Sequence, residues 1–187
     1  MTTKSMIIDI STILFQQKGY KGVGLNEILK ECKVTKGSLY HHFPNGKEEL
    51  LIACLNSMSC AITTDIVDIF KRCQSTREAV KVMIEQLIGD FERQGTIAGY
   101  TFTSIVSEMG SMSEPVRIAC SDLYIKMQGI YRRKLYEDGF SKEAAESLAL
   151  MMTATIEGGI MLCLTKKTSE PLQIISYELV NLLKEHQ

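Results

Sequence analysis

Residues 34–50 read VTKGSLYHHFPNGKEEL, and the local signals in this stretch predict the structure at the start of the chain. Thr35 is a suitable N-cap for a short helix over 36–42. Another short helix, expected over 25–32, precedes it after a three-residue connection, and a longer helix comes before both. Two short helices joined by a tight turn and supported by a longer helix predict a helix-turn-helix.

The second short helix is the predicted recognition helix, which enters the major groove of DNA. Leu39 and Phe43 are four residues apart and would face inward. Small residues at the helix start allow close approach to a groove, and a lysine there meets phosphate where the helix dipole favours it. A further lysine opens the next helix, where free backbone N–H groups also favour phosphate. The candidate DNA-binding residues are Lys36, Gly37, Ser38, Tyr40, His41, His42 and Lys47.

The histidine pair also raises the alternative of a metal site. Adjacent helical residues point about 100° apart, and no other histidine or cysteine ligand set lies nearby in the sequence. The Asn-Gly-Lys of the following turn lacks the spacing of a phosphate-binding loop. The sequence therefore predicts no metal and no cofactor.

The composition is that of a soluble globular protein: 187 residues, 45% hydrophobic and 23% charged. No apolar run approaches the roughly 18–20 residues of a membrane span, and the first residues lack the features of a signal peptide. We therefore expect a cytoplasmic protein with no membrane partner. The six cysteines form no CxxC and suggest reduced, mostly buried thiols, with redox sensing as the alternative.

Helical periodicity continues to the end of the chain, and alternating strand patterns are nearly absent. The predicted fold is all-α, with a three-helix DNA-binding domain over 1–46 and a larger helical ligand-binding and dimerisation domain over 47–187. The expected helices cover residues 4–18, 25–32, 36–42, 47–72, 76–94, 100–109, 113–138, 141–164 and 171–185.

The first 50 residues resemble the signature of the TetR family of bacterial transcriptional repressors. The matching positions, in order, are Phe15, Gly19, Tyr20, Ile28, Val34, Lys36, Gly37, Ser38, Leu39, Tyr40, His42, Phe43, Lys47, Glu48 and Leu50. Two positions depart from the signature. The turn after Phe43 is one residue longer, and Gly24 stands where a serine or threonine commonly caps the second helix. The longer turn, with SEPVRIAC and IEGGIMLCLTKK further on, is similar to the LmrA/YxaF branch.

The resemblance implies a repressor that binds a palindromic operator as a homodimer and is released by a small hydrophobic or aromatic ligand. Two alternatives stay open: a protein of this fold that acts through protein partners, and an all-helical enzyme. Intact Lys36, Tyr40 and Lys47 argue against the first. The absence of paired carboxylates, a Ser-His-Asp order or metal-ligand spacing argues against the second, so no enzyme is predicted.

Apolar and soft side chains cluster on the helices expected over 76–94, 100–109 and 113–138. At helical spacing such residues also form ordinary cores, and the resemblance favours a ligand cavity between them. The candidate ligand-binding residues are Met83, Leu87, Phe91, Tyr100, Phe102, Thr103, Ile105, Met109, Leu123, Met127 and Tyr131.

The last two expected helices carry small and apolar stripes that suit a four-helix bundle between two subunits. The alternative is that these stripes face the protein's own core. The candidate dimer-interface residues are Ala145, Leu148, Met152, Ile156, Gly159, Ile175, Leu179 and Leu182.

Overall fold

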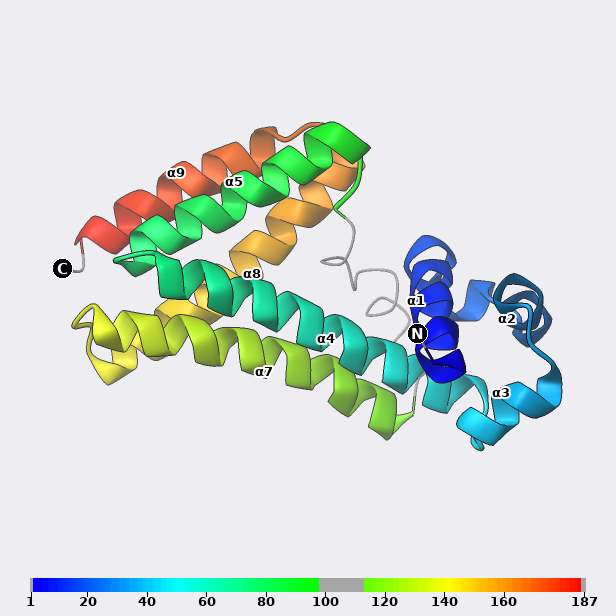
Figure 1. Ribbon diagram of the computed structural model, residues 1–187. Coiled ribbons are helices and arrows are strands. Elements are labelled where there is room, and N and C mark those ends of the chain that lie inside the picture. Colours follow the sequence, from blue (N-terminus) through cyan, green and yellow to red (C-terminus); the bar gives the residue numbers. More distant parts are fainter. Residues whose placement is uncertain (1, 98–112, 186–187) are drawn as a thin grey trace. The chain divides into compact units, whose positions relative to one another are not determined.

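The computed structural model of the chain describes residues 2–97 and 113–185 (Figure 1). These ranges contain helices and short turns and no strand, so the all-α prediction is confirmed. The helices, with the labels of Figure 1, are α1 (Thr3–Gly22), α2 (Leu25–Cys32), α3 (Lys36–His42), α4 (Lys47–Arg72), α5 (Thr76–Gln94), α7 (Glu114–Glu137), α8 (Lys142–Lys166) and α9 (Glu170–Glu185). The helix expected over 100–109 lies outside the described residues.

The boundaries of α2 to α5 agree with the predicted ones, because each end carries a local signal. Thr35 caps α3, Ser75 caps α5 and Gly95 ends α5 in the left-handed region at φ +68°. The first helix is longer than expected. Gly19, the residue after the expected end at 18, leaves helical geometry at φ +70°, but one more turn continues to Gly22.

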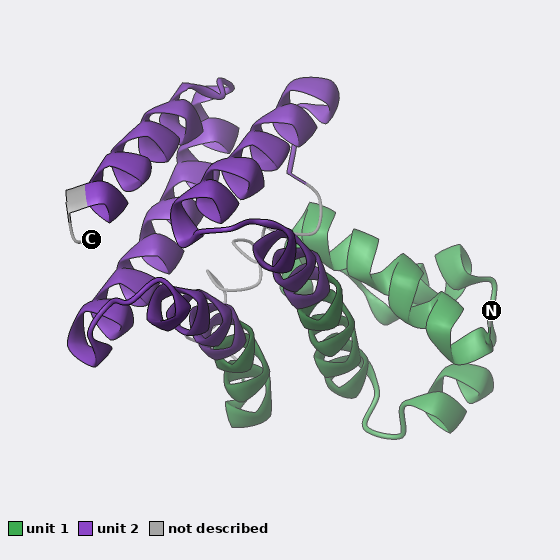
Figure 2. Ribbon diagram, turned by 60° about the vertical axis from the view of Figure 1, so that its left-hand side comes forward, with its two compact units in different colours: residues 1–61, 102–123 green, residues 62–101, 124–187 purple. Residues whose placement is uncertain are grey.

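The chain divides into two compact units (Figure 2). Unit 1 comprises Met1–Ala61 and Phe102–Leu123, and unit 2 comprises Ile62–Thr101 and Tyr124–Gln187. The predicted division after residue 46 therefore falls inside unit 1. The first part of α4 belongs with the helix-turn-helix because it is bonded to α1: the Cys54 thiol donates to the Ile8 carbonyl at 3.5 Å.

Unit 1 has its own apolar core, to which every helix of the helix-turn-helix contributes. Ile7, Phe15, Ile28, Leu39 and Phe43 are each at most 1% exposed. Burying a side chain of this size contributes about 1.5–3 kcal/mol. The orientation of α3 is therefore fixed by hydrophobic contacts within unit 1.

In unit 2, α9 lies against both α5 and α8. Gly159 allows the close approach of α8 and α9, since a Cβ there would lie 2.5 Å from Ile175 Cδ1 and 2.9 Å from Leu172 Cδ2. At the other end of α5, the Thr76 N–H donates to Asp138 Oδ2 at 2.5 Å. These contacts position the helices that carry the ligand and dimer candidates.

By length and composition alone, α4 and α8 could each cross a membrane. This corrects the expectation that no apolar stretch approaches that length, because scattered Ser, Thr and Asn interrupt the runs without lowering the average hydropathy below that of a span. Such helices are weak evidence for a membrane, since core helices of soluble proteins have the same composition. Both helices supply core residues, among them Leu50 and Ile66 from α4 and Met152 and Ile156 from α8.

Candidate functional site

The side chains of α3 alternate between buried and exposed positions with the period of about four residues that a helix has. Leu39 and Phe43 are buried at 0% and 1% exposure, which confirms them as inward anchors. Ser38 and His42 are half-buried at the edges of the helix. The face turned to solvent consists of Lys36, Gly37, Tyr40 and His41. The structure thus gathers four of the seven candidate DNA-binding residues on one exposed helix face, with two more beside it.

The start of α3 is capped by a side chain. Thr35 Oγ1 accepts a hydrogen bond from the Ser38 N–H at 3.2 Å, as the sequence predicts. Lys36 Nζ lies 5.9 Å from the centroid of the Tyr40 ring. A cation and a phenol therefore stand together near the helix N-terminus, where backbone N–H groups and the helix dipole favour an anion.

The turn between α2 and α3 begins with a residue in the left-handed helical conformation, which ends α2. Lys33 has φ +53°, and its N–H reaches the carbonyls of Leu29 and Lys30. At the other end of α2, Gly24 provides no side-chain cap. There an exposed ion pair joins α1 to α2, and the Lys18 ammonium beside Glu27 lowers the pKa of that carboxyl.

The Pro-Asn-Gly turn after α3 shows how the additional residue is accommodated. Gly46 takes φ +71°, and its N–H donates to the Phe43 carbonyl at 2.8 Å. The Asn45 N–H donates to Glu49 Oε2, also at 2.8 Å. A Cβ at Gly46 would lie 3.4 Å from the Tyr40 ring, so the ring rests against the turn backbone.

Lys47 is engaged within unit 1. Its Nζ donates to the Tyr20 carbonyl at 2.5 Å and lies 4.0 Å from the centroid of the Tyr20 ring. The pKa of the Tyr20 phenol is raised by burial and then by the charge of Glu48. An ammonium has three donor hydrogens, so a phosphate contact by Lys47 stays a prediction beside its role in tying α4 to α1.

The two histidines pack against each other and against the end of α3. The His41 and His42 rings lie 5.0 Å apart in an edge-on arrangement, and His42 lies 6.4 Å from Phe43. Among the residues that the structure describes, no group of three or more His, Cys, Asp and Glu side chains is placed to hold a metal ion. The histidine pair therefore belongs to the exposed edge of α3.

Six of the ligand candidates lie in the described part of the chain, and all six are buried: Met83, Leu87, Phe91, Leu123, Met127 and Tyr131. The other five, Tyr100, Phe102, Thr103, Ile105 and Met109, lie outside the described residues. Leu123 belongs to unit 1 and the other five buried residues to unit 2.

The structure brings two of these candidates into contact within unit 2. The Tyr131 hydroxyl donates to Met83 Sδ at 3.6 Å, and the Tyr131 ring lies 5.3 Å from that of Phe70. Sequence reasoning missed Phe70. The signal available was the buried stripe that it forms with Ile62, Ile66 and Ile69 on α4. The buried cluster thus includes an aromatic side chain from α4 as well as residues of α5 and α7.

Burial separates two kinds of apolar residue on α8 and α9. Of the eight dimer candidates, Ala145, Leu148, Met152, Ile156, Gly159 and Leu179 are buried within the subunit, and Ile175 and Leu182 are half-buried. Their burial fits the alternative that this stripe faces the protein's own core. The large apolar residues left exposed on the same helices are Leu150, Met151, Met161, Leu162, Ile174 and Tyr177.

Glu157 lies within the exposed stripe of α8. Leu150, Ala154, Glu157 and Met161 follow one another at helical spacing, so one acid stands among apolar neighbours. Burial raises the pKa of the Glu157 carboxyl to about 7. Within the described residues, no hydrogen bond or ion pair compensates that burial.

We expect this acid to make the stability of the chain depend on pH. The folded protein keeps the Glu157 proton up to about pH 7, whereas the unfolded chain releases it near the ordinary value of 4.5. Folding therefore takes up a proton in that window, and the free energy of unfolding falls as the pH rises through it, by about 1–2 kcal/mol for a half-buried group. Urea unfolding of wild type and Glu157→Gln at pH 5 and pH 8 measures this, and an equal pH slope in both proteins would contradict it.

The cysteines divide into five buried residues and one exposed residue, Cys60, and none of these six described residues forms a disulfide. Burial raises the pKa of the Cys54 thiol to about 12, and it also raises the pKa of the Cys32 thiol. A thiol with a raised pKa is a poor nucleophile at neutral pH. Cys32 and Cys54 therefore act as apolar core residues of unit 1.

The comparisons with known proteins agree with this arrangement. Residues 7–54 match the model for the tetR family of bacterial regulatory proteins, and residues 76–178 match that for the C-terminal domain of LmrA/YxaF-like transcriptional regulators. The chain is 38% identical over 182 residues to the HTH-type transcriptional regulator LmrA of Bacillus subtilis, with 97% of each chain covered. It is 35% identical over 183 residues to YxaF of the same organism, an uncharacterised HTH-type transcriptional regulator, covering 98% of this chain and 96% of YxaF.

Solved structures show the same fold. The reduced form of NemR from Escherichia coli superposes with a TM-score of 0.83 at 23% identity, covering 96% of this chain and 95% of NemR. These matches identify a DNA-binding transcriptional regulator and not an enzyme, as the sequence predicts. The chain belongs to the TetR family of bacterial transcriptional regulators, with a C-terminal domain of the LmrA/YxaF type.

Proposed function

We propose that this regulator is a repressor that binds a palindromic operator as a homodimer and is released by a small hydrophobic or aromatic ligand. The observation that carries the proposal is the exposed face of α3, with Lys36, Gly37, Tyr40 and His41 on a helix whose opposite face is fully buried. The cytoplasm, where a bacterial operator lies, is the proposed location.

Gly37 supports a close approach to DNA. A Cβ at this position would meet only Thr35 Oγ1, at 3.9 Å, so packing within the described chain does not require a glycine here. A glycine in the first turn of a helix lowers helix stability by up to about 1 kcal/mol relative to alanine. An external requirement, the floor of the major groove, accounts for a small residue at the exposed start of α3.

The exposed apolar face of α8 and α9 supports a homodimer. Leu150, Met151, Met161 and Leu162 form a stripe along α8, and Ile174 and Tyr177 continue it on α9. Between the two ends of the α8 stripe, Ala154 and Gly158 leave room for a second helix to approach. A two-fold arrangement of α8 and α9 from two subunits would bury this face, and two recognition helices would then meet half-sites about 34–36 Å apart.

Release by a ligand requires a connection between the buried cluster and the DNA-binding unit. α7 contributes to both. Tyr131 belongs to the cluster in unit 2. At the other end of the helix, the hydroxyl of Ser113, the residue just before α7, donates a hydrogen bond to Glu48 Oε1 at 2.6 Å within unit 1. A ligand held beside Tyr131 and Met83 would shift α7 and, through Ser113 and Glu48, the start of α4. A ligand can shift this equilibrium only by its difference in affinity for the two states.

The name of one relative supports repression rather than activation of transcription. NemR of E. coli, which is 29% identical to this chain over 118 residues, is an HTH-type transcriptional repressor. Testing the proposal begins with selection of bound sequences from random DNA. An inverted repeat among those sequences supports two-fold binding, and no enrichment would contradict operator binding and favour a regulator that acts through protein partners. Titration of candidate aromatic compounds against the complex then tests release.

Lys36→Ala is expected to weaken operator binding. Each subunit would lose one phosphate contact, so affinity should fall roughly 10- to 100-fold for the dimer, and the slope of log affinity against log salt should decrease by about 2. Fluorescence anisotropy with the selected operator over a range of salt concentrations measures both. Lys142→Ala, which removes the same charge from an exposed position in unit 2, should leave affinity and slope unchanged. Equal loss in both variants would refute a specific role for Lys36.

A further inference from the structure

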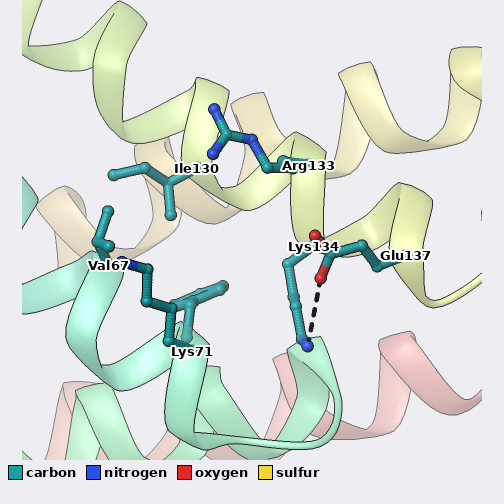
Figure 3. A pocket seen from close by; sticks show the side chains of 7 residues that line it. Val67, Lys71, Ile130, Arg133, Lys134 and Glu137 are labelled. Carbon is teal, nitrogen blue, oxygen red and sulfur yellow. Dashed lines mark ion pairs between the residues drawn. The ribbon is translucent and has the colours of Figure 1, made fainter.

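A groove within unit 2 lies apart from the DNA-binding face and the dimer face proposed above, and it shares Phe70 with the buried cluster. It lies between α4 and α7 and has a volume of about 280 Å³ (Figure 3). Pockets for drug-sized ligands span about 300–1,000 Å³, so this groove suits a smaller molecule. Its lining has two chemically distinct parts, an apolar floor and a charged rim.

The floor is formed by Val67 and Phe70 of α4 and Ile130 of α7. Phe70 is 4% exposed, and its ring centroid lies 5.3 Å from that of Tyr131. Val67 and Ile130 are half-buried and come from the two different helices that border the groove (Figure 3). A floor of this kind favours the apolar body of a ligand, since covering the half-buried Val67 and Ile130 removes aliphatic surface from water.

The rim carries three cations and one carboxylate: Lys71, Arg133, Lys134 and Glu137. Lys134 pairs with Glu137 at 3.4 Å, and its side chain is only 15% exposed. Within the described residues, Lys71 and Arg133 have no ion-pair partner. Two positive charges therefore remain uncompensated beside an apolar floor, one on each helix.

A basic rim can also be an ordinary solvated surface, and α7 offers a direct comparison. Arg132 is exposed and adjacent to Arg133 in sequence, but it does not line the groove. What distinguishes Arg133 and Lys71 is that they border an apolar recess. Charge and apolar surface combined in one small volume match a molecule that carries both.

We propose that this groove binds a small organic anion, a carboxylate attached to an aromatic or similarly sized apolar body of one or two rings. The ring would cover Phe70, Val67 and Ile130, and the carboxylate would accept hydrogen bonds from the Arg133 guanidinium and the Lys71 ammonium. The site shares Phe70 with the buried cluster but takes its charged rim from other residues, and its test measures neither release by an effector nor operator binding.

The test uses 2-naphthoate as the probe and 2-naphthamide as its uncharged counterpart of nearly equal shape. The chain contains no tryptophan, so naphthyl fluorescence is read against a weak protein background. We expect saturable binding of 2-naphthoate that weakens as salt is added. Binding of the amide should be at least roughly fivefold weaker, because it lacks the charge that the rim selects.

Variants of the rim give results of opposite sign. Lys71→Ala and Arg133→Ala should each weaken 2-naphthoate binding roughly fivefold. Glu137→Gln should strengthen it, because it removes the competing carboxylate and frees Lys134. Arg132→Ala is the matched control and should bind as the wild type does. All four positions lie at the surface or in a surface ion pair, and circular dichroism checks that each variant is folded.

Three results would overturn the proposal. The first is absence of saturable binding at millimolar 2-naphthoate. The second is equal affinity for acid and amide, which would indicate apolar binding without charge recognition. The third is equal loss in Arg132→Ala and Arg133→Ala, or no loss in Arg133→Ala, which would place the bound molecule elsewhere. Operator affinity is not a readout in any of these measurements, so a failure here leaves the proposed repressor function untouched.

Discussion

Leu39→Ala is expected to abolish operator binding by unfolding the helix-turn-helix. Leu39 is fully buried and is one of the two residues that hold α3 against the rest of unit 1. Leucine-to-alanine changes at such sites lower the free energy of unfolding by about 3–5 kcal/mol, the loss of transfer free energy plus the cavity left behind. Since the whole stability of a domain is only about 5–15 kcal/mol, the recognition helix would no longer be held in one orientation.

Native-state amide hydrogen exchange measures this effect in each unit separately. In Leu39→Ala, amides of α1, α2 and α3 should exchange faster, whereas those of α8 and α9 should keep their protection. The matched control is the neighbouring residue. Tyr40 is 39% exposed, so Tyr40→Phe should leave exchange unchanged and alter only affinity for DNA. Unchanged exchange in Leu39→Ala would show that α3 is positioned by something other than its buried anchor.

Local signals in the sequence explain why α2 to α5 could be predicted with their boundaries. Thr35 accepts a hydrogen bond within its own first turn, and Gly95 ends α5 by a left-handed conformation that few other residues adopt. These interactions join residues three or four positions apart, so they can be read without a tertiary structure. The same holds for the exposed face of α3, because Leu39 and Phe43 define the opposite face by their spacing.

The proposed dimer face could not be predicted in the same way, because both sides of α8 are apolar. Met152 and Ile156 are buried, and Leu150 and Met161, on the other side of the helix, are exposed. Hydrophobic periodicity cannot decide which side meets the subunit's own core. That choice is made by long-range contacts, such as those of Gly159 with Leu172 and Ile175, which only the fold reveals.

Tertiary contacts also define the features that the sequence did not indicate. The sequence indicates only that Lys47 lies at the start of a helix. In the structure its Nζ donates a hydrogen bond to the carbonyl of Tyr20, 27 residues earlier. The groove is similar: Lys71 and Arg133 are remote in sequence and line one groove only because that groove lies between α4 and α7. Charges on separate helices carry no periodic signal, so a mixed apolar and basic site of this kind requires the structure.

The second large effect is expected from Leu150→Glu combined with Met161→Glu. If α8 meets its counterpart in a two-fold bundle, the double variant places four carboxylates in one apolar interface, near the Glu157 side chains. Burying unpaired charges costs several kcal/mol, so the dimer dissociation constant should rise roughly 1,000-fold or more. Operator affinity should fall with it, because two linked recognition helices bind a palindrome far more tightly than one.

Analytical ultracentrifugation at micromolar concentration, together with operator binding, measures both consequences. Leu150 and Met161 are 59% and 49% exposed, so each subunit should keep its helix content by circular dichroism. The control is Ile125→Glu on α7, which adds a charge at a residue that is 61% exposed but outside the α8 and α9 face. It should remain dimeric and bind the operator normally. A double variant that stays dimeric would place the subunit interface elsewhere, whereas a monomer with unchanged operator affinity would separate DNA binding from dimerisation and contradict recognition of a palindrome by two linked subunits.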